Sequence, residues 1–136
     1  MNSIKYKAGY KYILAENYSC HIDIYPVMDI VTEYVSLDKF GTLTIKKGFA
    51  WDGCSGPTWD DRSNMRGGMI HDGLYGLLRE QHLSSAFRDE VDGIFHKALI
   101  EDGMNRVRAW YYYNAVRKFA GYAASPRNQK KILTAP

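Results

Sequence analysis

The sequence has few cysteines and no strong excess of charge of either sign. Only two cysteines, Cys20 and Cys54, occur in 136 residues. Two cysteines this far apart are too few for a disulfide framework or for a zinc site built from cysteines. A net charge of +3 is too small to indicate a nucleic-acid partner, although it suits weak attraction to an anionic surface. We therefore expect no nucleic acid among the partners.

Long hydrophobic runs are also missing. No apolar run approaches the roughly 20 residues that a membrane-spanning helix needs. The first residues, MNSIKYKAGYKY, lack the apolar segment of a signal peptide. The sequence therefore predicts neither a transmembrane segment nor a secretory leader, while packaging into a particle stays open as a route out of the cell.

The residues that are present indicate one globular domain, residues 1–136, because hydrophobic residues make up 46% and charged residues 24% of the chain. The first 48 residues are predicted to be β-rich. Alternating apolar and polar residues favour strands at 10–14, 20–25, 32–37 and 42–46. Residues 38–41, which read DKFG, are predicted to form a hairpin turn between the last two of these strands.

The second part of the chain is predicted to be helical. Helices are expected over residues 64–78, 84–100 and 105–120, with Ser84 as an N-cap and with Gly103 and Gly121 beyond helix ends. A glycine-rich loop, residues 49–59, separates the two parts, and residues 122–136 are expected to form a tail. The fold class predicted from this order is α+β.

The segment MIHDGLY, residues 69–75, places two ionisable side chains inside an apolar helix. Buried ionisable groups are costly unless they are paired or bind a metal. On a helix, His71 and Tyr75 share a face, while Asp72 points about 100° away from His71. If the next helix packs antiparallel, one of its acids, Asp89 or Asp92, can face His71. A carboxylate bonded to one imidazole nitrogen makes the other nitrogen a general base.

Other readings of these residues stay open. His71 and Asp92 can form a buried polar network that only fixes helix packing, and Tyr75 can be a core tyrosine. Asp52 can be a turn residue bonded to its own backbone. Asp89 and the cationic residues of the last helix are expected on solvated helix faces; the latter are Arg106, Arg108, Arg117 and Lys118. His82 and His96 do not supply the spacing of a metal-dependent phosphohydrolase.

Four motifs carry a resemblance to known families. They are DGCS at 52–55, HDGLY at 71–75, Arg88-x-x-x-Asp92-x-x-Phe95, and AWYYYNAVRKF at 109–119. Over residues 49–121 the chain resembles the secreted phospholipase A2 superfamily of bacteria and fungi. Over nearly its whole length it is more closely similar to a family of small proteins found in tailed phages and prophages. The predicted fold is thus a β-rich N-terminal layer followed by a three-helix phospholipase A2-like unit.

The resemblance to phospholipase A2 implies a calcium-dependent hydrolase of lipid esters. It implies that His71 activates water, that Asp92 orients His71, and that Tyr75 supports both. It also implies Ca²⁺ ligands from Asp52, the Gly53 carbonyl and Asp72. The secreted enzymes have a cysteine three residues before the histidine, where this chain has Gly68, so Cys54 lacks the partner that the resemblance would give it.

The resemblance to the phage family implies a second function. The chain can be a virion protein of the tail, baseplate or neck, structural or accessory, that keeps the helical scaffold without catalysis. The partners implied by the two resemblances are a phospholipid or membrane surface and phage structural proteins. The expected location is the virion or the host cytoplasm.

Overall fold

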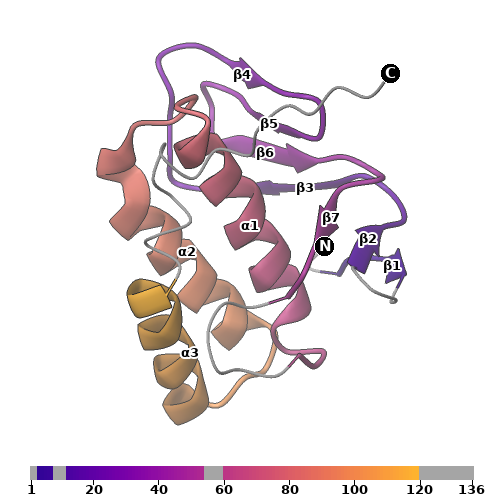
Figure 1. Ribbon diagram of the computed structural model, residues 1–136, viewed down its shortest axis with the longest axis vertical. Coiled ribbons are helices and arrows are strands. Elements are labelled where there is room, and N and C mark those ends of the chain that lie inside the picture. Colours follow the sequence, from indigo (N-terminus) through magenta and orange to yellow (C-terminus); the bar gives the residue numbers. More distant parts are fainter. Residues whose placement is uncertain (1–2, 8–11, 54–59, 120–136) are drawn as a thin grey trace, which may run out of the picture.

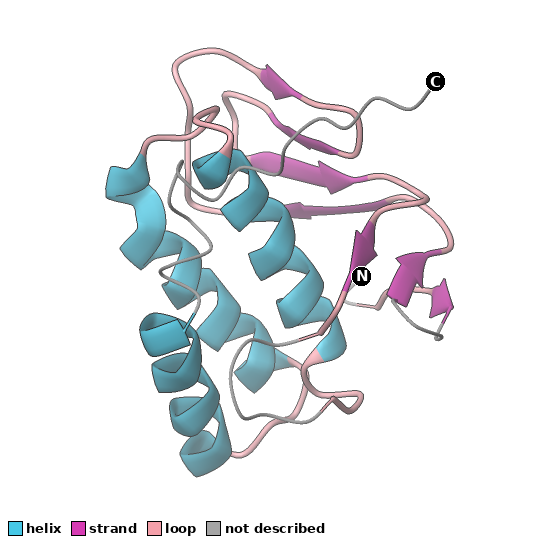
Figure 2. Ribbon diagram, viewed as in Figure 1, coloured by secondary structure: helices cyan, strands magenta, loops and turns pink. Residues whose placement is uncertain are grey.

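Strands from the first part of the chain lie beside three helices from the second part (Figure 1, Figure 2). The computed structural model describes residues 3–7, 12–53 and 60–119. The strands are β1 (Tyr6–Lys7), β2 (Tyr12–Leu14), β3 (Tyr18–His21), β4 (Ile30–Val31), β5 (Val35–Leu37), β6 (Thr42–Ile45) and β7 (Ala50–Trp51). The helices are α1 (Met65–Arg79), the short 3₁₀ helix η1 (Ser85–Phe87), α2 (Arg88–Glu101) and α3 (Arg106–Phe119). This order confirms the predicted α+β fold with an N-terminal β layer and three helices.

The strands form two antiparallel sheets. The small sheet has the order β1-β2-β7, and the larger sheet has the order β3-β6-β5-β4. In the larger sheet, β3 pairs with β6 in the register Cys20↔Leu43, and β5 pairs with β6 in the register Leu37↔Leu43. Leu37 and Leu43 are completely buried, so this register places the apolar side chains of the sheet in the core.

The predicted hairpin turn between β5 and β6 is confirmed. The Asp38 carboxylate accepts hydrogen bonds from the backbone N–H groups of Phe40 and Thr42, both at 2.9 Å. Gly41 has a φ of +86°, a conformation that residues with a Cβ seldom adopt. A side chain at Gly41 would also clash with the Ile22 carbonyl oxygen. Both the backbone conformation and the lack of space therefore require glycine at this position.

Strand boundaries were predicted less well than the hairpin. The strand predicted at 20–25 begins at Tyr18 and ends at His21. Ile22 and Ile24 are buried although they lie outside the strand, which explains the apolar pattern that extended the prediction. The loop predicted at 49–59 contains the short strand β7, which pairs with β2 in the register Tyr12↔Trp51. Residues 54–59 of that loop lie outside the described residues.

Helix α1 is the central element of the core and lies between the larger sheet and α2 (Figure 1). Its apolar residues are buried on nearly every side, with Met69, Ile70 and Leu74 at most 1% exposed. A helix buried in this way needs no polar face. Gly73 allows the close approach to the sheet, because a Cβ at this position would lie 3.2 Å from Ile45 Cδ1.

Helices α1 and α2 are adjacent and antiparallel, as predicted. At the start of α1, the buried Arg66 donates from Nε to Asp102 Oδ2 (2.9 Å) and from Nη2 to Glu101 Oε1 (3.0 Å), at the end of α2. At the other end, Arg88 Nε donates to Tyr75 OH at 3.2 Å. The remaining guanidinium nitrogen of Arg66 donates to Tyr18 OH of β3 at 3.0 Å, which links both helices to the larger sheet.

Helix α3 packs against α2 and is less solvated on its cationic side than the sequence suggested. Asn105 Oδ1 accepts a hydrogen bond from Arg108 N at 2.8 Å, an N-cap at the predicted start. Arg108 pairs with Asp61 at 2.6 Å, and Arg117 lies against Asp92 at 2.6 Å. The prediction of a solvated face was therefore wrong for Arg108 and Arg117, because each finds a carboxylate on another segment.

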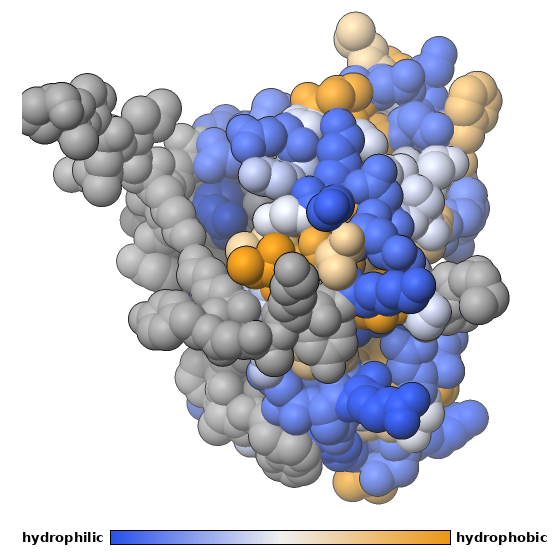
Figure 3. Space-filling view, turned by 90° about the vertical axis from the view of Figure 1, so that its right-hand side faces the viewer, coloured by the Kyte–Doolittle hydropathy of each residue, from blue (hydrophilic) through white to orange (hydrophobic). Residues whose placement is uncertain are grey.

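None of the helices in the described ranges combines the length and the apolar character that crossing a membrane requires. The face on the side of the small sheet is mostly hydrophilic, with hydrophobic residues in separate groups (Figure 3).

Candidate functional site

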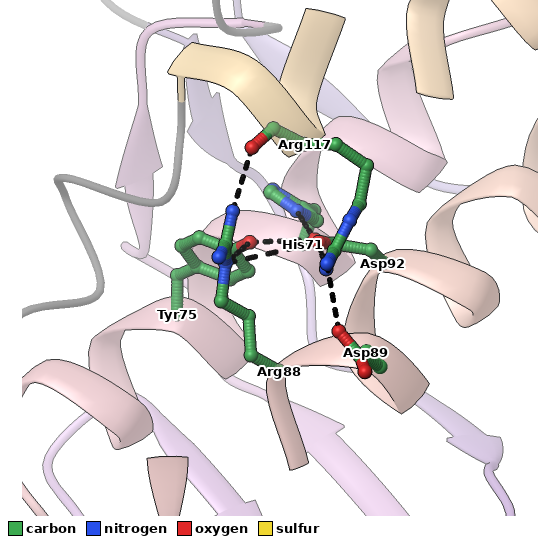
Figure 4. Close-up of polar contacts among 6 residues, drawn as sticks. All are labelled: His71, Tyr75, Arg88, Asp89, Asp92 and Arg117. Carbon is green, nitrogen blue, oxygen red and sulfur yellow. Dashed lines mark hydrogen bonds and ion pairs between the residues drawn. The ribbon is translucent and has the colours of Figure 1, made fainter. Parts of the chain in front are cut away.

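The predicted contact between His71 of α1 and Asp92 of α2 is present. His71 Nε2 lies 2.7 Å from Asp92 Oδ1, and Tyr75 OH donates to the same oxygen at 2.6 Å (Figure 4). The spacing of four residues brings the rings of His71 and Tyr75 into contact, with centroids 4.0 Å apart and planes tilted by 33°. Phe95, one turn after Asp92, packs against the imidazole at 5.0 Å. Two helices thus bring together the three residues predicted to be catalytic.

Two arginines complete the surroundings of Asp92. Arg117 Nη1 of α3 donates to Asp92 Oδ2 at 2.6 Å, and its Nη2 pairs with Asp89 at 2.8 Å. Arg88 Nε donates to Tyr75 OH, and Arg88 Nη2 donates to the Arg117 carbonyl oxygen at 2.7 Å (Figure 4). Arg88 Nε itself lies 4.0 Å from Asp92 Oδ2. Both carboxylate oxygens of Asp92 are therefore occupied, and all three helices meet at this residue.

The site is buried, which changes the acidity of its groups. His71 is 3% exposed and Asp92 is 0% exposed. Burial lowers the pKa of His71, against the opposing effect of its bond to Asp92, so the ring favours its neutral form. Burial alone would raise the pKa of Asp92, but its bonds to His71, Tyr75 and Arg117 outweigh burial and lower the pKa. Asp92 is therefore a carboxylate beside a neutral imidazole.

The hydroxyl of Tyr75 is held in its protonated form. Burial raises the pKa of Tyr75, and the hydrogen bond to the Asp92 carboxylate raises it further. Tyr75 therefore acts as a hydrogen-bond donor at neutral pH and not as an acid. Within the described residues, no hydrogen bond engages Nδ1 of His71. A neutral imidazole whose Nε2–H is held by a carboxylate presents Nδ1 as a proton acceptor.

The residues predicted to bind Ca²⁺ differ in solvent exposure. Asp52 is exposed and Asp72 is half-buried on α1. Gly53 has a φ of +97°, and a Cβ there would lie 2.5 Å from Asp60 Oδ2, so the Asp60 carboxylate lies directly against the Gly53 backbone. Among the described residues, no three side chains of His, Cys, Asp or Glu gather into a group that could hold a metal ion. Residues 54–59 of the predicted loop lie outside the described residues.

Sequence reasoning missed three residues around the site. Arg117 was expected in solvent, and Asp60 was not considered near Gly53. Arg88 was noted only for its position one turn before Asp92. The one feature of the sequence that could have indicated these partners is the expected burial of Asp92, because a buried aspartate requires hydrogen-bond donors or a cation. That requirement predicts a partner but does not identify which helix supplies it.

Comparison with known proteins gives one family and no individual relative. A family model described as "Protein of unknown function (DUF1353)" matches residues 28–116. The match extends from the segment before β4 to the last turns of α3, and it includes His71, Tyr75 and Asp92. Neither a curated protein nor a solved structure matches the chain.

Proposed function

We propose that this chain, which belongs to the DUF1353 family, is a phage-associated hydrolase of lipid or other carboxylic esters, of the phospholipase A2 type and dependent on calcium. One observation supports the proposal above all. Asp92 Oδ1 accepts hydrogen bonds from both His71 Nε2 and Tyr75 OH, which fixes the ring and leaves the other ring nitrogen for chemistry. The resemblance to a phage protein family supports the association with phages.

In the proposed reaction, His71 is the general base. Its Nδ1 removes a proton from a water molecule while the water oxygen attacks the ester carbonyl. Asp92 stabilises the imidazolium that forms, as a carboxylate bonded to the opposite nitrogen does. The same proton then passes from Nδ1 to the departing alkoxide, which leaves as an alcohol, and the acyl group leaves as a carboxylic acid.

Tyr75, Arg117 and Arg88 are positioning residues in this scheme. Tyr75 and Arg117 hold the two oxygens of Asp92 from opposite sides, so the carboxylate cannot rotate away from the imidazole. Arg88 in turn holds the Tyr75 hydroxyl. A preorganised group of this kind supplies its charge without reorganising during the reaction.

Calcium is proposed as the metal because the proposed ligands offer oxygen atoms. Asp52, the Gly53 carbonyl and Asp72 are the proposed ligands, and oxygen donors of this type suit Ca²⁺. Bound calcium would supply Lewis-acid stabilisation of the oxyanion. Asp60, which lies against Gly53, is a further oxygen donor at this loop. Because no three His, Cys, Asp or Glu side chains of the described residues form a metal-binding group, calcium is a separate part of the proposal with its own test.

The hydrolase proposal is tested with the full chain on phospholipid vesicles. Fatty-acid release is measured in millimolar calcium for the wild type, His71→Asn, Asp92→Asn and the control Asp89→Asn. Loss of the base is expected to reduce the rate by about 10²–10⁴, with a smaller loss for Asp92→Asn. The control removes an exposed carboxylate and should keep most activity. Full activity in His71→Asn, or no release by the wild type, would contradict the proposal.

The calcium part is tested by thermal melting. A ligand that binds only the folded state raises the melting temperature as its concentration increases. Calcium titration should raise the melting temperature of the wild type and raise it less in Asp52→Asn and Asp72→Asn. Unchanged melting in calcium, together with full hydrolysis in a chelator, would remove calcium from the mechanism and leave the base intact.

A second candidate is a structural or accessory role in the tail, baseplate or neck of a virion, without catalysis. It is favoured by large hydrophobic side chains exposed on strand β4 and in loops of the larger sheet. They are Val27 (93%), Met28 (77%), Phe40 (73%) and Val31 (72%). A hydrogen bond of 2.9 Å from Lys39 N to Asp29 Oδ1 joins two of these loops. Mass spectrometry of purified particles separates the candidates, because absence of the chain from virions would exclude the structural role.

A further inference from the structure

A groove separates strand β3 from helix α2, away from the His71 site. It holds a pocket of about 320 Å³. One wall is the run of β3 and the residues after it, the other wall is one face of α2, and the floor is α1. The lining residues are Ser19, Cys20, His21, Ile22 and Asp23 on the first wall, Ile94, Lys97, Ala98 and Glu101 on the second, and Arg66 and Ile70 on the floor.

The strand in this wall has an unpaired edge. β3 is the last strand of the larger sheet on the side opposite β4 (Figure 1). Its inner edge is paired to β6, and Ile22 N continues this pairing by donating to the Gly41 carbonyl at 2.8 Å. Backbone groups two residues apart point the same way along a strand. The N–H and C=O groups of Ser19 and His21 therefore point away from β6, on the side of the groove.

No partner takes up that edge within the described part of the chain. Neither the N–H nor the C=O of Ser19 or His21 forms a backbone hydrogen bond there. Unpaired backbone groups on a sheet edge are the template on which another strand pairs. Natural sheets often cover such an edge with a helix or a charged side chain. Here α2 lies beside the edge but leaves a pocket between them.

The second wall carries Lys97, which forms no ion pair with a described residue, while the first wall carries the Asp23 carboxylate. Ile94, Lys97 and Glu101 share one face of α2, at spacings of three and four residues. Arg66 on the floor is neutralised by Asp102 and Glu101. Lys97 is exposed, and no carboxylate among the described residues lies within 4.0 Å of its ammonium group. A ligand in the groove therefore meets one free cation at the α2 wall.

We propose that this groove binds an extended segment of a partner protein as an additional strand. The segment pairs with the outward backbone groups of Ser19 and His21. A side chain on its inner face enters the pocket over Ile70 and Ile94. An acidic side chain of the segment pairs with Lys97.

The test uses a displayed library of random dodecapeptides, selected on the immobilised full chain. Selected peptides should alternate β-branched residues with others and carry an acidic residue. Binding should be about tenfold weaker or more in His21→Pro, which removes one outward N–H and spares the pairing with β6. His21→Ala keeps that N–H and should retain binding. Lys97→Trp should block the groove, while the control Glu90→Trp, at an exposed position of α2 outside the lining, should not.

Hydrogen exchange gives a second readout that does not depend on any variant folding. The amides of Ser19 and His21 should exchange fast in the free chain and become protected when a selected peptide binds. Failure to select any peptide, or peptides that bind Lys97→Trp as well as wild type, would overturn the proposal. Dimerisation of the chain that Lys97→Trp abolishes would also overturn it, because the occupant would then be a second copy. Each of these outcomes is independent of ester hydrolysis.

Discussion

Arg117 of α3 and Asp92 of α2 lie in direct contact, with Arg117 Nη1 2.6 Å from Asp92 Oδ2. The other oxygen of Asp92 is shared by His71 and Tyr75 of α1. A single buried carboxylate thus fixes three helices relative to one another. The contact between Arg117 and Asp92 has a structural role whether or not the site is catalytic. It also links the geometry of the His71–Asp92 pair to the packing of α3 on α2.

Removing this guanidinium should destabilise the fold. In Arg117→Met, Asp92 stays buried and loses a charged donor, so the free energy of unfolding should fall by about 1–3 kcal/mol. The pKa of Asp92 should rise at the same time, because Arg117 is one of the groups that lower it. Urea denaturation of Arg117→Met and of the control Arg106→Met, an exposed position on the same helix, measures the difference. Equal losses in the two variants would show that the contact with Asp92 contributes nothing.

The Tyr75 hydroxyl should contribute to both stability and hydrolysis. Tyr75→Phe keeps the ring in contact with His71 and removes the donor to Asp92, so the free energy of unfolding should fall by about 1–2 kcal/mol. If Tyr75 positions Asp92, kcat should fall while KM changes little, because the hydroxyl acts on the base and not on the bound substrate. Tyr113→Phe is the control, since the Tyr113 hydroxyl makes no hydrogen bond with the described residues. A purely structural role would leave kcat unchanged after correction for folded protein.

Local relationships at the site could be read from the sequence. The contact between His71 and Tyr75 follows from their spacing on one helix. The helix predicted from residue 105 begins there, where the structure shows Asn105 as the N-cap. The pairing of His71 with Asp92 required one assumption, that α1 and α2 pack antiparallel. That assumption left Asp89 and Asp92 as candidates, and the resemblance to phospholipase A2 selected Asp92, which is buried on α2 in the structure.

Relationships that depend on tertiary packing could not be read in the same way. Arg117 reaches Asp92 across 25 residues and Arg66 reaches Asp102 across 36, and nothing in the local pattern distinguishes these arginines from solvated ones. The end of β3 was misjudged because Ile22 and Ile24 are buried outside the sheet. Burial and strand pairing produce the same apolar pattern, and only the positions of the neighbouring strands separate them.

The protonation of His71 should make stability depend on pH. Its folded pKa lies below the unfolded value of 6.5, so the unfolded state binds the proton more readily. Stability linked to His71 is therefore complete above pH 6.5 and falls as the pH drops through the folded pKa. The free energy of unfolding, measured between pH 5 and pH 8, should fall toward acid pH in the wild type and fall less in His71→Asn. The carboxylate of Asp92, whose unfolded value is 3.8, titrates at lower pH and does not account for that slope. Identical slopes in the two proteins would contradict a buried neutral imidazole.

Substitution by alanine should change the free energy of unfolding in opposite directions at two helical glycines, Gly93 and Gly73. Gly93 is exposed on α2, and a Cβ there would meet nothing within 4 Å. Gly93→Ala should raise the free energy of unfolding by about 0.5–1 kcal/mol, because alanine loses less backbone entropy in a helix.

Gly73 is buried on α1, where a Cβ would lie 3.2 Å from Ile45 Cδ1 and 3.5 Å from Val35 Cγ2. Ile45 is 0% exposed and has little room to move, so Gly73→Ala should lower stability despite the same gain in helix propensity. Thermal or urea denaturation of the two variants measures both signs, and a stabilised Gly73→Ala would show that α1 does not pack as closely on the sheet as the Gly73 contacts indicate.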